Sequence, residues 1–149
     1  MVQAVAIGPS KFGEALYIAE GLSNRINQLR LPESLPKGMD LSRNVSQPYV
    51  ESSLFNFGPN TAMTFRGDGT MFVTNGDNLL LIPAGGGRVD PLFNDTNAKS
   101  PYQQLSGVTV DRMGNVYVSD SQLGTVTMLP INAQLPNIGL MGYDDAGKK

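Results

Sequence analysis

Apolar residues fall in short runs separated by turn-forming residues, and one such arrangement occurs three times along the chain. In its most regular copy, residues 107–130, apolar runs at 108–110, 116–118 and 126–129 are separated by a Gly-Asn turn and a Ser-Asp-Ser turn. Short runs rich in valine and bounded by Gly, Asn, Asp and Ser are typical of strands joined by tight turns. The pattern therefore predicts antiparallel strands.

The other two copies repeat this order of elements. The first is predicted to contain a strand at residues 4–7, a turn at 8–15, and strands at 16–20 and 26–31. The second is predicted to have its strands at the following positions: 62–65, 71–75 and 79–82.

Two side-chain types recur at matching places in the three copies. An aromatic residue lies within the second strand of each copy: Tyr17, Phe72 and Tyr117. A polar residue ends the same strand: Glu20, Asn75 and Asp120. Because the polar residue recurs in every copy, we expect it to bind backbone N–H groups of the adjoining turn, rather than to form a functional ring at one mouth of the fold.

The spacing of the copies favours a β-propeller. Leu16, Met71 and Val116 occupy equivalent places and lie 55 and 45 residues apart. A weaker fourth apolar segment closes each copy, at 49–55, 89–93 and 135–141. Four strands in about 40–45 residues is the period of a propeller blade. The nearly continuous apolar inner strands agree with this, because stacked blades bury both faces of a sheet.

The predicted fold is therefore all-β and propeller-like, with three four-stranded antiparallel blades. A β-sandwich of three hairpins is the alternative, but it does not require the same elements to recur in order. The predicted domain is 1–142, with blades at about 1–57, 58–103 and 104–142. Residues 143–149 are predicted to form a flexible tail, and residues 33–47 a surface insertion in the first blade.

The chain resembles two related families of propeller. The segments LYIAEGLSNRINQLRLP and GVTVDRMGNVYVSDSQLGTVTMLP are similar to NHL repeats, and GPNTAMTFRGDGTMFVTNG resembles the strand pair of the sugar-lactonase (gluconolactonase-like) propellers. The resemblance implies blades of a propeller that has about six of them. Three blades would be half or part of such a ring, which leaves two apolar faces to be covered by a second copy of the chain or by a protein partner.

Composition removes several functions. The chain has no histidine and no cysteine, which excludes a Ser-His-Asp triad, an imidazole base, thiol catalysis and histidine- or cysteine-bound zinc. We predict no catalytic residue and no cofactor. The net charge is −2 without a basic block, so nucleic acid is not an expected partner. No apolar run reaches the roughly 20 residues that span a membrane, so membrane insertion is not expected. The sequence does not predict the cellular compartment.

A metal site is implied only by the lactonase resemblance. It places Asn60 on that family's asparagine ligand. Its carboxylate positions fall on Ser106 and Gln3, neither of which is charged. Ca²⁺ and Zn²⁺ favour charged ligands, which these two positions do not supply. A lactonase-like metal-dependent hydrolase formed by an assembled propeller is therefore kept as the alternative function. The other interpretation of Asn60 is that it is a turn residue after Pro59 and binds no metal.

The preferred function is a non-enzymatic binding or scaffold module that forms a homo-oligomer or joins a larger complex. NHL-type propellers commonly bind macromolecules, and the resemblance implies the same here. The loops 33–47 and 94–104 are the predicted contact regions, because long loops on a rigid frame often carry recognition. Arg25, which matches the common Asn-Arg of NHL repeats, is a candidate for an ion pair with a neighbouring blade.

Overall fold

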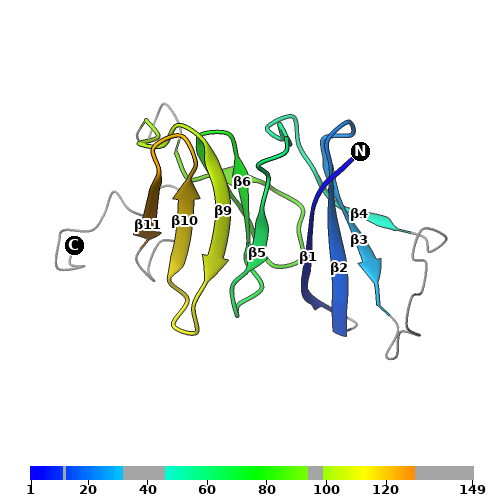
Figure 1. Cartoon of the computed structure of the whole chain (residues 1–149). Coiled ribbons are helices and arrows are strands. Elements are labelled where there is room, and N and C mark those ends of the chain that lie inside the picture. Colours follow the sequence, from blue (N-terminus) through cyan, green and yellow to red (C-terminus); the bar gives the residue numbers. More distant parts are fainter. Residues whose placement is uncertain (12, 32–45, 94–98, 130–149) are drawn as a thin grey trace, which may run out of the picture.

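All regular secondary structure in the described part of the chain is β. The computed structural model describes residues 1–11, 13–31, 46–93 and 99–129, and places their strands in three antiparallel sheets (Figure 1). The prediction of an all-β fold is thereby confirmed. Over the same ranges no helix is long and apolar enough to cross a membrane.

Each sheet is a meander in which consecutive strands pair. The first sheet runs β1 (Val2–Ser10), β2 (Gly13–Glu20), β3 (Arg25–Arg30) and β4 (Gln47–Glu51). The second runs β5 (Met63–Phe65), β6 (Met71–Asn75), β7 (Asn78–Ile82) and β8 (Asp90–Pro91). The third contains β9 (Leu105–Val110), β10 (Val116–Asp120) and β11 (Thr125–Leu129).

Several predicted segments lie outside the described residues. The fourth strand expected at 135–141 and the tail at 143–149 are among them, as is most of the insertion at 33–47. The third sheet is therefore described through three strands, while the first and second have the four that were predicted.

The turn predicted at 8–15 is wrong. Strand β1 continues to Ser10, β2 starts at Gly13, and these two residues face each other across a tight hairpin. Gly8 and Pro9 suggested a turn but lie within the strand. Proline is tolerated there because β1 is the first strand of its sheet and has a free edge.

Gly8 is required by packing rather than by turn geometry. A Cβ at this position would lie 2.2 Å from the ring of Phe65, so the two sheets touch at this point. We expect Gly8→Ala to lower the free energy of unfolding by about 1–3 kcal/mol, because the ring must shift. Gly58→Ala, where a Cβ meets no atom within 4 Å, is the matched control. Equal urea midpoints for the two variants would contradict the close contact.

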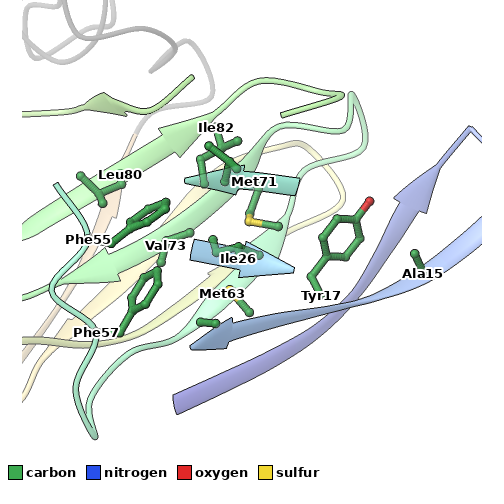
Figure 2. Packing of buried hydrophobic residues seen from close by; sticks show 12 residues of the cluster. Ala15, Tyr17, Ile26, Phe55, Phe57, Met63, Met71, Val73, Leu80 and Ile82 are labelled. Atoms are coloured by element: carbon green, nitrogen blue, oxygen red, sulfur yellow. The ribbon is translucent and has the colours of Figure 1, made fainter. Parts of the chain in front are cut away.

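The second sheet is buried on both faces. Residues of β6 and β7 alternate between two cores, with Met71, Val73, Leu80 and Ile82 facing the first sheet and Phe72, Leu79 and Leu81 facing the third. This alternation explains why β6 and β7 are almost continuously apolar, as expected for stacked sheets. Figure 2 shows the first core, in which Tyr17 and Ile26 of the first sheet lie against Met71 and Val73.

The first strands of the sheets lie next to one another. β1 contacts β5, β5 contacts β9, and Figure 1 shows the three strands running in the same direction. Their starting residues are therefore at one end of the molecule. The described residues form an open row of sheets that does not close into a ring.

Candidate functional site

Each sheet has two different faces, which we name by the second strand. The aromatic face carries the recurring ring, and the aliphatic face carries the residues on either side of that ring. The aromatic faces are built on Tyr17, Phe72 and Tyr117, whose partners on the first strand are the small residues Ala6, Thr64 and Thr109. The aliphatic faces are built on these pairs: Leu16 and Ile18, Met71 and Val73, Val116 and Val118.

Both contacts between sheets join an aromatic face to an aliphatic face. The aromatic face of the first sheet packs on the aliphatic face of the second, where the ring centroids of Tyr17 and Phe65 are 4.6 Å apart. The aromatic face of the second sheet packs in turn on the aliphatic face of the third, which brings Phe72 to Val116 and Val118. The same mode of packing is thus used twice.

Two faces lie at the outside of the row of sheets, the aromatic face of the third sheet and the aliphatic face of the first. On the aromatic face of the third sheet, Val126 and Met128 are 75% and 56% exposed. On the aliphatic face of the first sheet, Val5 and Ile7 are 58% and 53% exposed. Apolar side chains of the first and third sheets, which lie at opposite ends of the row (Figure 1), are thus exposed to solvent. On the same face as Ile7, Leu29 of β3 is only 4% exposed, so the open part of this face lies over β1 and β2.

The exposed residues correspond to buried ones in the other sheets. By strand register, Val126 and Met128 match Leu79 and Leu81, which are fully buried. Val5 matches the buried Met63. Sequence reasoning anticipated exposed apolar faces without naming these residues. The period-two alternation of strands around each aromatic residue is the signal that identifies them.

The hydroxyl of Tyr117 is used within its own sheet. It donates to Asp111 Oδ2 over 3.0 Å, while Asp111 Oδ1 accepts the backbone N–H groups of Met113 and Asn115. A hydrogen bond from the Asn115 side chain, assisted by that from Tyr117, holds the pKa of the Asp111 carboxyl below its usual range. The ring of Tyr117 is therefore fixed on the open face with its polar atom already satisfied.

A hollow of about 480 Å³ lies between the first and second sheets, beside Tyr17 and Tyr49. Tyr17 Oη donates to the Pro9 carbonyl over 2.5 Å and accepts from Gln28 Nε2 over 3.0 Å. Burial, reinforced by the neighbouring Tyr49, raises the pKa of Tyr17 to about 12. The Tyr17 hydroxyl thus links β2 to β1 and β3, and its hydrogen bonds already have partners within the fold.

The polar residue that ends each second strand binds a nearby loop, but only Asp120 binds backbone N–H groups of the turn that follows it, as predicted. Asp120 Oδ2 accepts the N–H groups of Gln103 and Gln104, at 2.7 and 3.2 Å. Its Oδ1 accepts those of Gln122 and Leu123, both at 2.9 Å. Asp120 therefore holds both the loop that enters β9 and the turn that leaves β10.

The equivalents of Asp120 make fewer hydrogen bonds, and these differ in kind. Asn75 accepts from the Asn56 N–H over 2.7 Å and donates to the Leu54 carbonyl over 3.0 Å. Glu20 Oε2 accepts the Ser23 hydroxyl over 2.9 Å. All three side chains thus have local structural partners.

Asp120→Asn is expected to destabilise the chain at neutral pH. Burial opposes ionisation of Asp120, but the four backbone N–H groups outweigh it and hold its pKa below the ordinary value. A lowered folded-state pKa stabilises the fold above the unfolded pKa of about 4, and this stabilisation is lost as the pH falls through the folded-state pKa. The Tm difference between wild type and variant should therefore narrow below about pH 4. A difference that stays constant from neutral pH into this acid range would contradict the role of the charge.

Asn60 lies exposed in the turn before β5. The turn is closed by the Thr61 N–H bonded to the Gly58 carbonyl over 2.9 Å, and the backbone carbonyl of Asn60 accepts the Thr74 hydroxyl over 3.1 Å. Asn60 and Gln104 both line a hollow of about 240 Å³. The side chain of Asn60 is thus available at the end where the first strands of the sheets begin.

Strand register refines the comparison of Asn60 with the other two positions. Gln3 and Ser106 each lie at an irregularity in the pairing of the first strand of their sheets. The residue at the matching place in the second sheet is Thr61, one position after Asn60. Ser106 Oγ is 3.2 Å from Ser119 Oγ. Over the ranges described, no group of three or more Asp, Glu, His or Cys residues is placed to hold a metal ion.

The other predicted contacts are placed as follows. Arg25 makes no ion pair within the described residues, and its Nε is buried without a hydrogen-bond partner there. The loop 94–104 is described from residue 99. Tyr102 is buried in the second core, and Gln103 and Gln104 are bound to Asp120, so this part is held to the fold.

Comparison with known proteins leaves the family open. No protein-family model matches the chain, and no curated protein matches it significantly.

Proposed function

We propose that this chain is a non-enzymatic binding and scaffold module made of NHL-like propeller blades, and that it acts through self-assembly. The observation that carries the proposal is the pair of open apolar faces at the two ends of the row of sheets. Val5 and Ile7 at one end, and Val126 and Met128 at the other, are more than half exposed, whereas their equivalents inside the molecule are covered.

Burial of these faces would be strongly favourable. Each Å² of apolar surface removed from water stabilises an assembly by about 25 cal/mol, before the costs of association are subtracted. Contiguous apolar patches on otherwise polar proteins commonly mark interaction sites. The exposed residues lie on strands of hydrogen-bonded sheets, so little backbone ordering is needed when the faces are covered.

Binding is favoured over catalysis by the use made of the acidic side chains. The chain has no histidine or cysteine, and Asp68, Asp111 and Asp120 all accept backbone N–H groups of turns. Hydrogen bonds from Arg66 hold the pKa of Asp68 at about 2. These carboxylates are therefore kept ionised and stabilise turns.

The alternative, a lactonase-like hydrolase with Ca²⁺ or Zn²⁺ in a central channel, requires Asn60 as a ligand. A metal that binds only the folded chain would raise its Tm by mass action. The proposed scaffold predicts an unchanged Tm on adding Ca²⁺ or Zn²⁺, in wild type and in Asn60→Ala alike.

The proposal is tested by measuring the Tm at increasing protein concentration. Because association stabilises only the folded chain, the Tm should rise by a few degrees over a ~100-fold increase in concentration. A Tm independent of concentration, together with a monomeric mass, would overturn the proposal.

A further inference from the structure

We infer that two copies of the chain associate head to tail, with the open aromatic face of each packed on the open aliphatic face of the other. The inference rests on the proposed self-assembly and adds the partner and the polarity of the contact. It follows from the two contacts between sheets that the molecule already contains.

Strand register defines which residues should meet. Tyr17 of the first sheet contacts Phe65 of the second, with ring centroids 4.6 Å apart. Tyr117 is the equivalent of Tyr17, since both lie three residues before the polar residue that ends the second strand and both pair with a small residue on the first. Ile7 is the equivalent of Phe65, since each pairs with the residue just before the central aromatic. Tyr117 of one copy is therefore expected against Ile7 of the other.

The two open faces carry the types of side chain that meet at the contacts inside the molecule. The aromatic face of the third sheet carries Tyr117, the small residues Gly107, Thr109 and Ser119, and the exposed apolar side chains of Val126 and Met128. The aliphatic face of the first sheet is lined by Val5, Ile7, Leu16 and Ile18. At the contacts inside the molecule, an aromatic ring of one face likewise packs on apolar side chains of the next, Tyr17 on Phe65 in the first core and Phe72 with Val116 and Val118 in the second.

Pairing of like faces fits less well. Two aromatic faces would bring Tyr117 and Met128 against their own copies and leave the aliphatic face, with Val5 and Ile7, open. Two aliphatic faces would bring Val5 and Ile7 against their own copies and leave the aromatic face open. Only the mixed pairing covers both exposed faces at once.

The mixed pairing also closes. Each copy has one face of each kind, at opposite ends of its row of sheets (Figure 1). Two copies related by a two-fold axis would form two identical contacts. The resulting ring would contain six sheets, within the range of about four to eight blades that propellers have. No open face would remain.

Cysteine crosslinking tests the polarity, because the chain contains no cysteine of its own. Single variants Thr109→Cys and Ile7→Cys place one thiol on each open face. The two proteins are mixed, diluted to allow exchange, reconcentrated and treated with a short bismaleimide. Leu22→Cys, at an exposed position in the turn after β2, replaces Ile7→Cys as the matched control.

The mixture of Thr109→Cys and Ile7→Cys should give a crosslinked dimer on a denaturing gel, with about half of the dimers carrying both variants if exchange is random. Each variant alone, and the mixture with Leu22→Cys, should stay uncrosslinked. Crosslinking of Thr109→Cys or Ile7→Cys to itself would overturn the head-to-tail inference, as would an associated protein that gives no mixed crosslink. A chain that is monomeric in solution would instead overturn the proposed function itself. Val126→Cys with Val5→Cys provides a second pair if either first variant fails to fold.

Discussion

Ile7→Asp is expected to weaken self-association by at least about 100-fold in Kd, which corresponds to about 3 kcal/mol. In the isolated chain Ile7 is 53% exposed, so a carboxylate there can remain hydrated and the fold should be retained. In the assembly the same carboxylate would be buried against Tyr117 of the other copy without a partner. Sedimentation velocity over a dilution series measures the change.

Leu22→Asp is the matched control for Ile7→Asp. Leu22 is more exposed than Ile7 but lies in a turn rather than on an open face, so its replacement should leave the Kd unchanged. Circular dichroism on both variants checks that the sheets are intact. If Ile7→Asp associated as tightly as wild type, the aliphatic face would not be part of the contact.

Phe72→Ala is expected to lower the free energy of unfolding by about 3–5 kcal/mol. The ring is fully buried between the second and third sheets, next to Leu105, Val116 and Val118, and its removal leaves a cavity that rigid strands cannot fill. This loss is a large fraction of the total stability of about 5–15 kcal/mol that domains usually have. Urea unfolding followed by circular dichroism provides the measurement.

Tyr117→Ala is the informative comparison for Phe72→Ala, because the two residues occupy equivalent places in different sheets. At a concentration where the chain is monomeric, Tyr117 has no sheet packed on its ring, so its removal should destabilise the fold by much less. At a concentration where the chain is associated, the loss should increase. Equal losses for the two variants in the monomer would mean that the face of Tyr117 is already covered.

Much of the fold could be predicted because the repeat is visible in the sequence. Strands β6 and β10 begin where they were expected, because the turn-forming pairs Asp68-Gly69 and Gly114-Asn115 lie just before them. The aromatic positions were likewise evident from their recurrence. Repetition lets three weak local signals support one another.

The short turn between β1 and β2 could not be predicted, because Gly8 and Pro9 are placed by packing and by a free strand edge and do not form a turn. Gly8 makes room for Phe65, a residue 57 positions away in the chain, and Pro9 occupies a strand with a free edge. Such reasons depend on how sheets pack, which local sequence does not reveal. The same limit applies to the open faces, whose residues look like ordinary core residues in the sequence.

The metal alternative depends on Asn60, and the sequence could suggest that residue only through resemblance. The structure places it in an exposed turn at the end where the first strands begin. Gln3 and Ser106, where the resemblance would require carboxylates, are uncharged. The exposed apolar residues of the first and third sheets support association of the chain, not metal binding.

The mass of the chain in solution tests the central claim most directly. The monomer is 16.0 kDa, and light scattering coupled to size-exclusion chromatography gives the mass independently of shape. We predict a species of about 32 kDa that dissociates on dilution, since two copies would cover both open faces. A stable 16.0 kDa monomer at high concentration would contradict the account, because its apolar faces would then remain in water.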